Sequence, residues 1–226
     1  TEHTYTTNDA GERASVLQRG TVFGDYGADN GATSVVFGYN SAGELASAAG
    51  YLGTGTSQPL PGRGYAFTYD TAGNRRTAAL DAETANYTDG AGTPGGNSLN
   101  QVRQRGTLKA HVSGTASSDA VVSVPGAALS RINGTRYWDA VLESWGQFSQ
   151  INLSATRGGQ TQSASVWALV RPAQESLLYD EEGNLTDDAL WHYQYDAENR
   201  LVRMTTRSAA DLAGLGWGST PPASEV

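Results

Sequence analysis

Hydrophobic and polar positions alternate over short runs in this chain, and several runs end in the same kind of turn. The clearest case is residues 67–75, Phe-Thr-Tyr-Asp-Thr-Ala-Gly-Asn-Arg. Alternation with a period of two predicts a half-buried strand. The following Asp-x-x-Gly predicts a tight turn, because Asp bonds nearby backbone amides and Gly adopts positive φ without steric cost. Each unit is therefore the start of a β-hairpin.

The unit occurs five times, with its Asp or Asn at positions 8, 40, 70, 180 and 196. In the last copy Asn199 replaces the glycine, and Asn is the residue that best tolerates positive φ after Gly. We therefore predict an antiparallel hairpin sheet over 1–102 and 174–206. Within it, 81–97 is expected to be a loop and 97–102 a new strand. Structural roles in turns and strands are assigned to Tyr69, Asp70, Gly73, Tyr179, Asp180, Gly183, Tyr195 and Asp196.

Residues 103–173 contain no copy of the unit. Short alternating runs separated by turn signals predict strands at 108–112, 120–124, 135–142, 148–155 and 162–170. Several short strands at this spacing favour a small immunoglobulin-like β-sandwich inserted between the third and fourth copies. Residues 207–226 are expected to form a C-terminal tail. The overall prediction is an all-β fold.

The motifs FTYDTAGNRRTA, FGYNSAGEL, LLYDEEGNL and YQYDAENRLVRM resemble the YD-repeat family, also called the RHS family. The resemblance covers 1–100 and 174–206. It implies a ribbon of hairpins that coils into a hollow extracellular or cell-surface shell, which in some bacterial members encloses a toxic C-terminal domain. Related shells occur in large animal adhesion receptors. The Asp-Pro element of the self-cleaving members is absent from this sequence, so toxin activity is not carried over.

Composition excludes several classes of function. The net charge is −8, whereas a nucleic-acid binder is expected to have a basic surface. No apolar run approaches about 18 residues, so membrane insertion is not expected. The absence of cysteine excludes disulfides and thiolate sites, and the three scattered histidines predict no metal site and no cofactor. The chain opens at Thr1 without a signal-peptide pattern, so we expect a processed piece of a secreted protein.

Carboxylates are the candidates for catalysis. Asp139 and Glu143 lie four residues apart in an alternating run, so a strand places them on one face about 13 Å apart. A glycosidase pair needs a separation of about 5–10 Å, which this spacing exceeds. Aromatic residues are the candidates for binding, because their rings stack on sugars. Trp138, Trp145 and Trp191 are the candidate contacts, with a polysaccharide as the partner.

Three hypotheses follow. The leading one is a structural or glycan-binding segment of an extracellular shell, without enzymatic activity. The alternative is a glycoside hydrolase that acts on polysaccharides from the same β framework. The third is a shell fragment without activity of its own, whose exposed strand edges form homo-oligomers.

Overall fold

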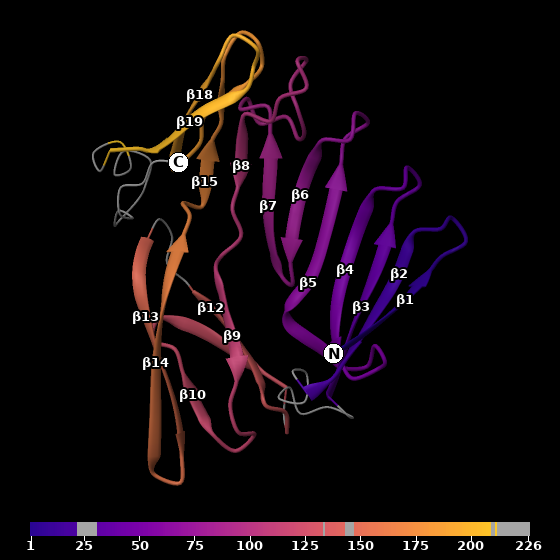
Figure 1. Ribbon diagram of the computed structural model, residues 1–226, viewed down its shortest axis with the longest axis vertical. Helices are drawn as coiled ribbons and strands as arrows, with labels where there is room; N and C mark the ends of the chain where they lie inside the picture. The colour runs from indigo at the N-terminus through magenta and orange to yellow at the C-terminus, as the bar shows by residue number, and fades with distance from the viewer. Residues whose placement is uncertain (22–30, 133, 143–146, 209–210, 212–226) are drawn as a thin grey trace.

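A computed structural model describes residues 1–21, 31–132, 134–142, 147–208 and 211, and shows a protein built of antiparallel strands and turns (Figure 1). This confirms the all-β prediction. None of the helices in the described residues has the length and apolar character needed to cross a membrane.

The largest sheet has nine strands, and we call it the hairpin sheet. Its first eight members follow the sequence order and the ninth is β15, which pairs with β8. The strand at this edge of the sheet, β15, therefore comes from a part of the chain that is far from β8 in sequence. The strands are β1 (Glu2–Thr7), β2 (Arg13–Arg19), β3 (Ala32–Tyr39), β4 (Leu45–Leu52), β5 (Pro59–Tyr69), β6 (Arg75–Leu80), β7 (Glu83–Thr88), β8 (Gln104–Gly106) and β15 (Gln174–Ser176).

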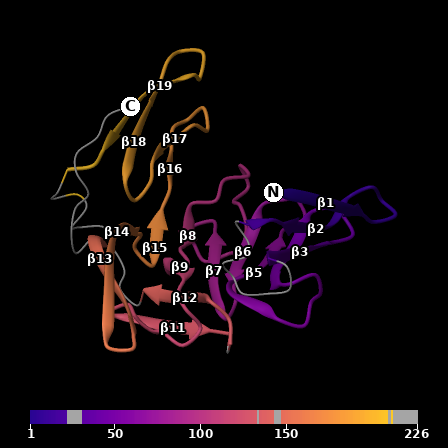
Figure 2. The same cartoon turned by 60° about the horizontal axis from the view of Figure 1, so that its bottom comes forward.

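A four-stranded sheet continues the hairpin sheet beyond β15 (Figure 2). The amide of Leu177 donates to the carbonyl of Arg103 at 2.8 Å, so the chain stays beside its neighbour as it passes from β15 to β16. The two sheets are separate in their strand pairing, and this backbone bond lies where the chain passes from one to the other. The four strands are β16 (Leu178–Tyr179), β17 (Leu185–Asp187), β18 (Trp191–Tyr195) and β19 (Leu201–Thr206).

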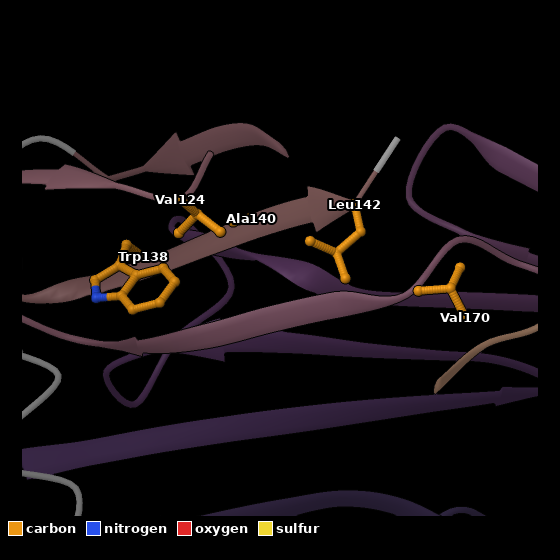
Figure 3. Close-up of a cluster of buried hydrophobic side chains, with 5 residues drawn as sticks. All are labelled: Val124, Trp138, Ala140, Leu142 and Val170. Carbon is orange, nitrogen blue, oxygen red and sulfur yellow. The ribbon is translucent and has the colours of Figure 1, made fainter. Parts of the chain in front are cut away.

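Residues 108–171 form a separate layer, which we call the insert. Its two three-stranded sheets have the orders β10-β13-β14 and β11-β12-β9. They enclose a common core that includes Val124, Trp138, Leu142 and Val170 (Figure 3). The strands are β9 (His111–Thr115), β10 (Val121–Ser123), β11 (Ala127–Arg131), β12 (Tyr137–Leu142), β13 (Gln147–Arg157) and β14 (Gln160–Val170).

Three details of the insert differ from the sequence expectation. The strand predicted over 108–112 is β9, which begins at His111 and ends at Thr115. The strand β11 was not predicted, because residues 127–131 follow a turn and do not alternate clearly. The strand β8, inside the predicted boundaries of the sandwich, pairs instead with β7 and β15 of the hairpin sheet. The amide of Thr107 donates to the carbonyl of Ala173 at 3.0 Å, so the two chain segments that lead into and out of the insert are hydrogen-bonded to each other.

The strand β12 holds the insert against the hairpin sheet. One of its faces points into the insert core through Trp138, Ala140 and Leu142. On the other face, the fully buried Tyr137 packs with Leu52 and donates its hydroxyl to the carbonyl of Pro61 at 2.8 Å. Burial raises the pKa of Tyr137. Because both faces are covered, β12 is apolar nearly throughout.

Candidate functional site

The repeated motif folds into one hydrogen-bonded turn, which we call the Asx turn. In the copy at Asp70, the amides of Ala72 and Asn74 donate to the carboxylate at 2.9 and 2.8 Å. The Asp70 amide in turn donates to the carbonyl of Asn74 at 2.9 Å. The fourth residue, Gly73, has a φ of 86°. The roles assigned to Asp70 and Gly73 follow directly from this geometry.

Seven Asx turns occur in the described residues, two more than the sequence predicted. In each, the first residue accepts a hydrogen bond from the amide of the fifth, and the fourth residue has positive φ. The first residues are Asn8, Asn40, Asp70, Asp89, Asn97, Asp180 and Asp196.

The expected loop over 81–97 contains the strand β7 (Glu83–Thr88), and the expected strand over 97–102 is the turn at Asn97. The turns at Asp89 and Asn97 are the two that were not predicted. Neither follows an aromatic-x-aromatic run, and the fourth residue of the second is Asn100 rather than Gly, with a φ of 62°. Asn199 adopts the same conformation, with a φ of 60°, as expected from the sequence. In the turns at Asp89 and Asn97, an Asp or Asn is followed three positions later by Gly or Asn, and this shorter pattern predicts the turn without the aromatic strand.

All the turns except the one at Asp89 follow one another in a row, as their side-chain contacts show. The hairpin ends lie along one edge of the sheets in Figure 1. The fifth residue of one turn faces the fourth residue of the next. Asn74 donates to the side chain of Asn100 at 2.6 Å, and Asn184 donates to the side chain of Asn199 at 2.9 Å. At the first pair, the carboxylate of Glu12 lies 3.2 Å from where a Cβ of Gly43 would stand.

A tyrosine hydroxyl links each of three turns, those at Asn40, Asp70 and Asp180, to the turn before it in the row. Tyr69 precedes its Asx turn and donates its hydroxyl to the carbonyl of Leu45 at 2.8 Å, just after the previous turn. Tyr39 makes the equivalent bond at 3.0 Å. Tyr179 donates to the carbonyl of Val102 at 2.8 Å, just after the turn at Asn97. The row therefore runs from Asn97 directly to Asp180, across the insert.

The turn at Asp70 predicts a dependence of stability on pH. Hydrogen bonds from the Asn74 side chain, and from the amides of Asn74, Gly96 and Ala72, lower the pKa of Asp70 from 3.8 to about 2. A group with a depressed folded-state pKa stabilises the fold above the unfolded value and loses this contribution as pH falls. For Asp70 that loss lies between about pH 4 and pH 2.

We expect Asp70→Asn to remove this part of the acid sensitivity, since Asn8 and Asn40 form the same turn without titrating. The measurement is the urea midpoint at pH 5 and pH 2.5. The midpoint of the unaltered chain should fall further than that of the variant. Equal falls would contradict a role of the Asp70 charge.

A buried cluster of charged side chains links the hairpin sheet to the four-stranded sheet, next to the point where the chain returns from the insert. Glu175 on β15 is 2% exposed, and it binds the guanidinium groups of Arg105 and Arg171, the latter at 2.7 Å. Asp188 lies 3.7 Å from each of these arginines and accepts the hydroxyl of Tyr193 at 3.1 Å. Burial, with the charge of Asp188, raises the pKa of Tyr193 to about 12.

This cluster holds two buried carboxylates, but each is bonded within the fold. The second oxygen of Asp188 accepts the amides of Leu190 and Trp191 at 2.8 Å. Arginine and backbone partners thus occupy the oxygens that a glycosidase would present to its substrate. The geometry suits a structural clamp.

The predicted catalytic residues do not form a described pair. Asp139 is 2% exposed and lies 2.7 Å from Nδ1 of His111. The other ring nitrogen of His111 is buried and has no hydrogen-bonding partner in the described part of the chain, so no nucleophile completes a triad there. Glu143 lies outside the described residues.

The three predicted sugar-stacking tryptophans are in different surroundings. Trp138 is 6% exposed, with its ring inside the insert core, so its face is not open to a sugar. Trp191 is half-buried on β18, and Trp145 lies outside the described residues. The exposed tryptophan of the described chain is Trp167 on β14, at 65%. Sequence reasoning did not select it.

No cluster of three or more His, Asp or Glu side chains that could hold a metal ion occurs among the described residues. The sequence matches no protein-family model and no curated protein. The resemblance to YD repeats therefore rests on the sequence motifs alone.

Proposed function

We propose that this chain is a structural segment of an extracellular shell of the YD-repeat type. Stacked hairpins make the shell wall, and the insert, a sandwich of the immunoglobulin-like class, is a module carried on it. The row of Asx turns that continues from Asn97 to Asp180 is the observation that carries the proposal. A chain that leaves the row after Gln101 and rejoins it at Asp180, with residues 102–179 between, keeps the wall intact around an added module.

The edge of the sheet supports the same role. All six residues of β1 are exposed, and β1 is the first strand in the sheet order. An uncovered edge strand is a template for pairing with another strand. In the proposed shell this edge pairs with a further hairpin or with a second copy of the chain.

Hydrogen exchange tests whether the wall is continuous. We expect the amides of the turns at Asn97 and Asp180 to exchange in one cooperative unit. Tyr179→Phe removes the bond between them, costs about 0.5–1.5 kcal/mol, and uncouples the two turns. Tyr195→Phe is the control, since the Tyr195 hydroxyl makes no hydrogen bond to the described residues. Independent exchange of the two turns in the unaltered chain would contradict a continuous wall.

The alternative function is a glycoside hydrolase, for which Asp139 remains the described candidate. Reducing-sugar release from cellulose, xylan and pectin derivatives at pH 5 and pH 7 separates the two functions. A structural segment releases nothing. Release that is abolished by Asp139→Asn or Glu143→Gln would establish the hydrolase instead.

A further inference from the structure

We propose that one end of the insert binds an acidic oligosaccharide of the uronic-acid class. Two adjoining hollows of about 490 and 190 Å³ open there, between the loop after β9 and the hairpin of β13 and β14. They share Thr115, Ala116, Ala155 and Gln162, so they form one cleft, which we call the insert cleft. Its size falls in the range of ligand sites, about 300–1,000 Å³.

The floor of the insert cleft is fixed by Trp138. Trp138 pairs with Gly114 of β9, and a Cβ on Gly114 would stand 2.8 Å from the indole ring. Glycine at this position is therefore what lets the ring lie flat under β9. The indole nitrogen points away from Leu142 and Val170, towards the end of the insert where the cleft opens (Figure 3). Trp138 thus offers a ligand the rim of its ring rather than the face.

One wall of the insert cleft is held rigid by Arg131. Its guanidinium donates to the carbonyls of Ala116, Ser117 and Ala120 at 2.9, 2.5 and 2.7 Å. A fourth bond, of 3.1 Å, reaches the carbonyl of Thr135. This one side chain shapes the loop over 116–120 before any ligand arrives. A preorganised wall lowers the entropy that binding must otherwise lose.

The charges around the insert cleft favour an anion. Arg136 and Arg157 line it, and its lining includes no acidic residue. Asp119 binds Arg157 at 2.8 Å, but both side chains are more than half exposed, so a ligand carboxylate can replace Asp119 at small cost. Guanidinium groups bind carboxylates in a bidentate manner. This local positive charge stands on a chain whose net charge is −8.

The uncharged part of the lining suits a sugar. Gln160, Gln162 and Ser117 carry amide and hydroxyl groups that both donate and accept hydrogen bonds. A sugar ring presents hydroxyls of the same dual character, and a uronic acid adds the carboxylate that arginine recognises. The binding site is inferred from the insert alone. The extracellular role proposed above enters only because acidic polysaccharides are found outside cells.

The test is an NMR titration of the full ¹⁵N-labelled chain with tetragalacturonic acid. The indole signal of Trp138 is identified by its loss in Trp138→Phe. We expect that signal to shift with tetragalacturonic acid and not with neutral cellotetraose. A response equal with both sugars, or no shift of the Trp138 signal at millimolar tetragalacturonic acid, would overturn the proposal. A shift confined to the exposed Trp167 would overturn it too, by placing the sugar elsewhere.

Matched arginine variants locate the binding charge. Arg157→Gln is expected to weaken binding at least tenfold, whereas Arg203→Gln on β19 removes the same charge far from the insert and leaves binding unchanged. Equal affinities of the two variants would contradict the assignment. Because the coupling between the turns at Asn97 and Asp180 is measured without ligand, failure of sugar binding leaves the wall proposal standing, and the reverse also holds.

Discussion

Replacing Glu175 with Gln is expected to lower the free energy of unfolding by about 2–3 kcal/mol. The Glu175 side chain is fully buried and is bonded to Arg105 and to Arg171, so the substitution leaves two guanidinium groups without their shared anion. The expected loss lies below the range of about 3–5 kcal/mol for a fully buried pair, because both arginine side chains are about one-third exposed and retain some solvation. Urea denaturation at pH 7 measures it.

Two further variants make the measurement specific. Glu182→Gln removes the same charge from an exposed turn position, and we expect a change within about 0.5 kcal/mol. Asp188→Asn alters the second carboxylate of the cluster. The double variant with Glu175→Gln should cost less than the sum of the two single changes, because both act on the same arginines. Additive costs, or a loss below about 0.5 kcal/mol for Glu175→Gln, would show that the cluster is not a clamp.

Gly62→Ala is expected to cost about 2–3 kcal/mol and to loosen the insert from the hairpin sheet. Gly62 has a φ of 70°, where an L-residue is strained. A Cβ there would also stand 2.5 Å from a carboxylate oxygen of Asp139. To relieve this contact, the Asp139 side chain must rotate, which breaks the hydrogen bond of 2.7 Å between its carboxylate and Nδ1 of His111. Thermal unfolding gives the cost, and the imidazole NMR signals of His111 report the lost contact.

Two other glycines separate the causes of this effect. Gly53 has a φ of 84° and open space around its Cβ position, so Gly53→Ala measures the backbone strain alone. Gly55 has neither strain nor neighbours, so Gly55→Ala should change stability little. The excess cost of Gly62→Ala over Gly53→Ala is the contact with Asp139. If the two costs are equal, Asp139 does not rest against Gly62 and the docking of the insert is different.

The Asx turn could be predicted from the sequence because the hydrogen bonds that define it lie within five residues. Asp70 accepts amides two and four positions later, and Gly73 supplies the one unusual φ, so both requirements are visible in a short motif. The turn at Asn97 meets the same requirements with Asn100 in place of Gly. No aromatic-x-aromatic strand precedes it as one does the turn at Asp70, so the full motif is absent from the sequence there.

Residues that act across the fold were beyond sequence reasoning. The bond from Tyr179 to Val102 spans 77 positions, and the contact between Asp139 and Gly62 joins the insert to β5. Trp138 belongs to a strand that is covered on both sides, so its burial depends on partners brought from elsewhere in the chain. No local pattern distinguishes such a buried tryptophan from one exposed to a sugar.

By itself, therefore, the sequence determined the all-β class, the five repeated turns and the existence of an interruption between the third and fourth of them. These features depend on alternation and on hydrogen bonds between near neighbours in the chain. The tertiary structure alone decided that the row of turns passes directly from Asn97 to Asp180, that Glu175 is buried between two arginines, and that one end of the insert is hollow. Each of these depends on which distant segments pack together.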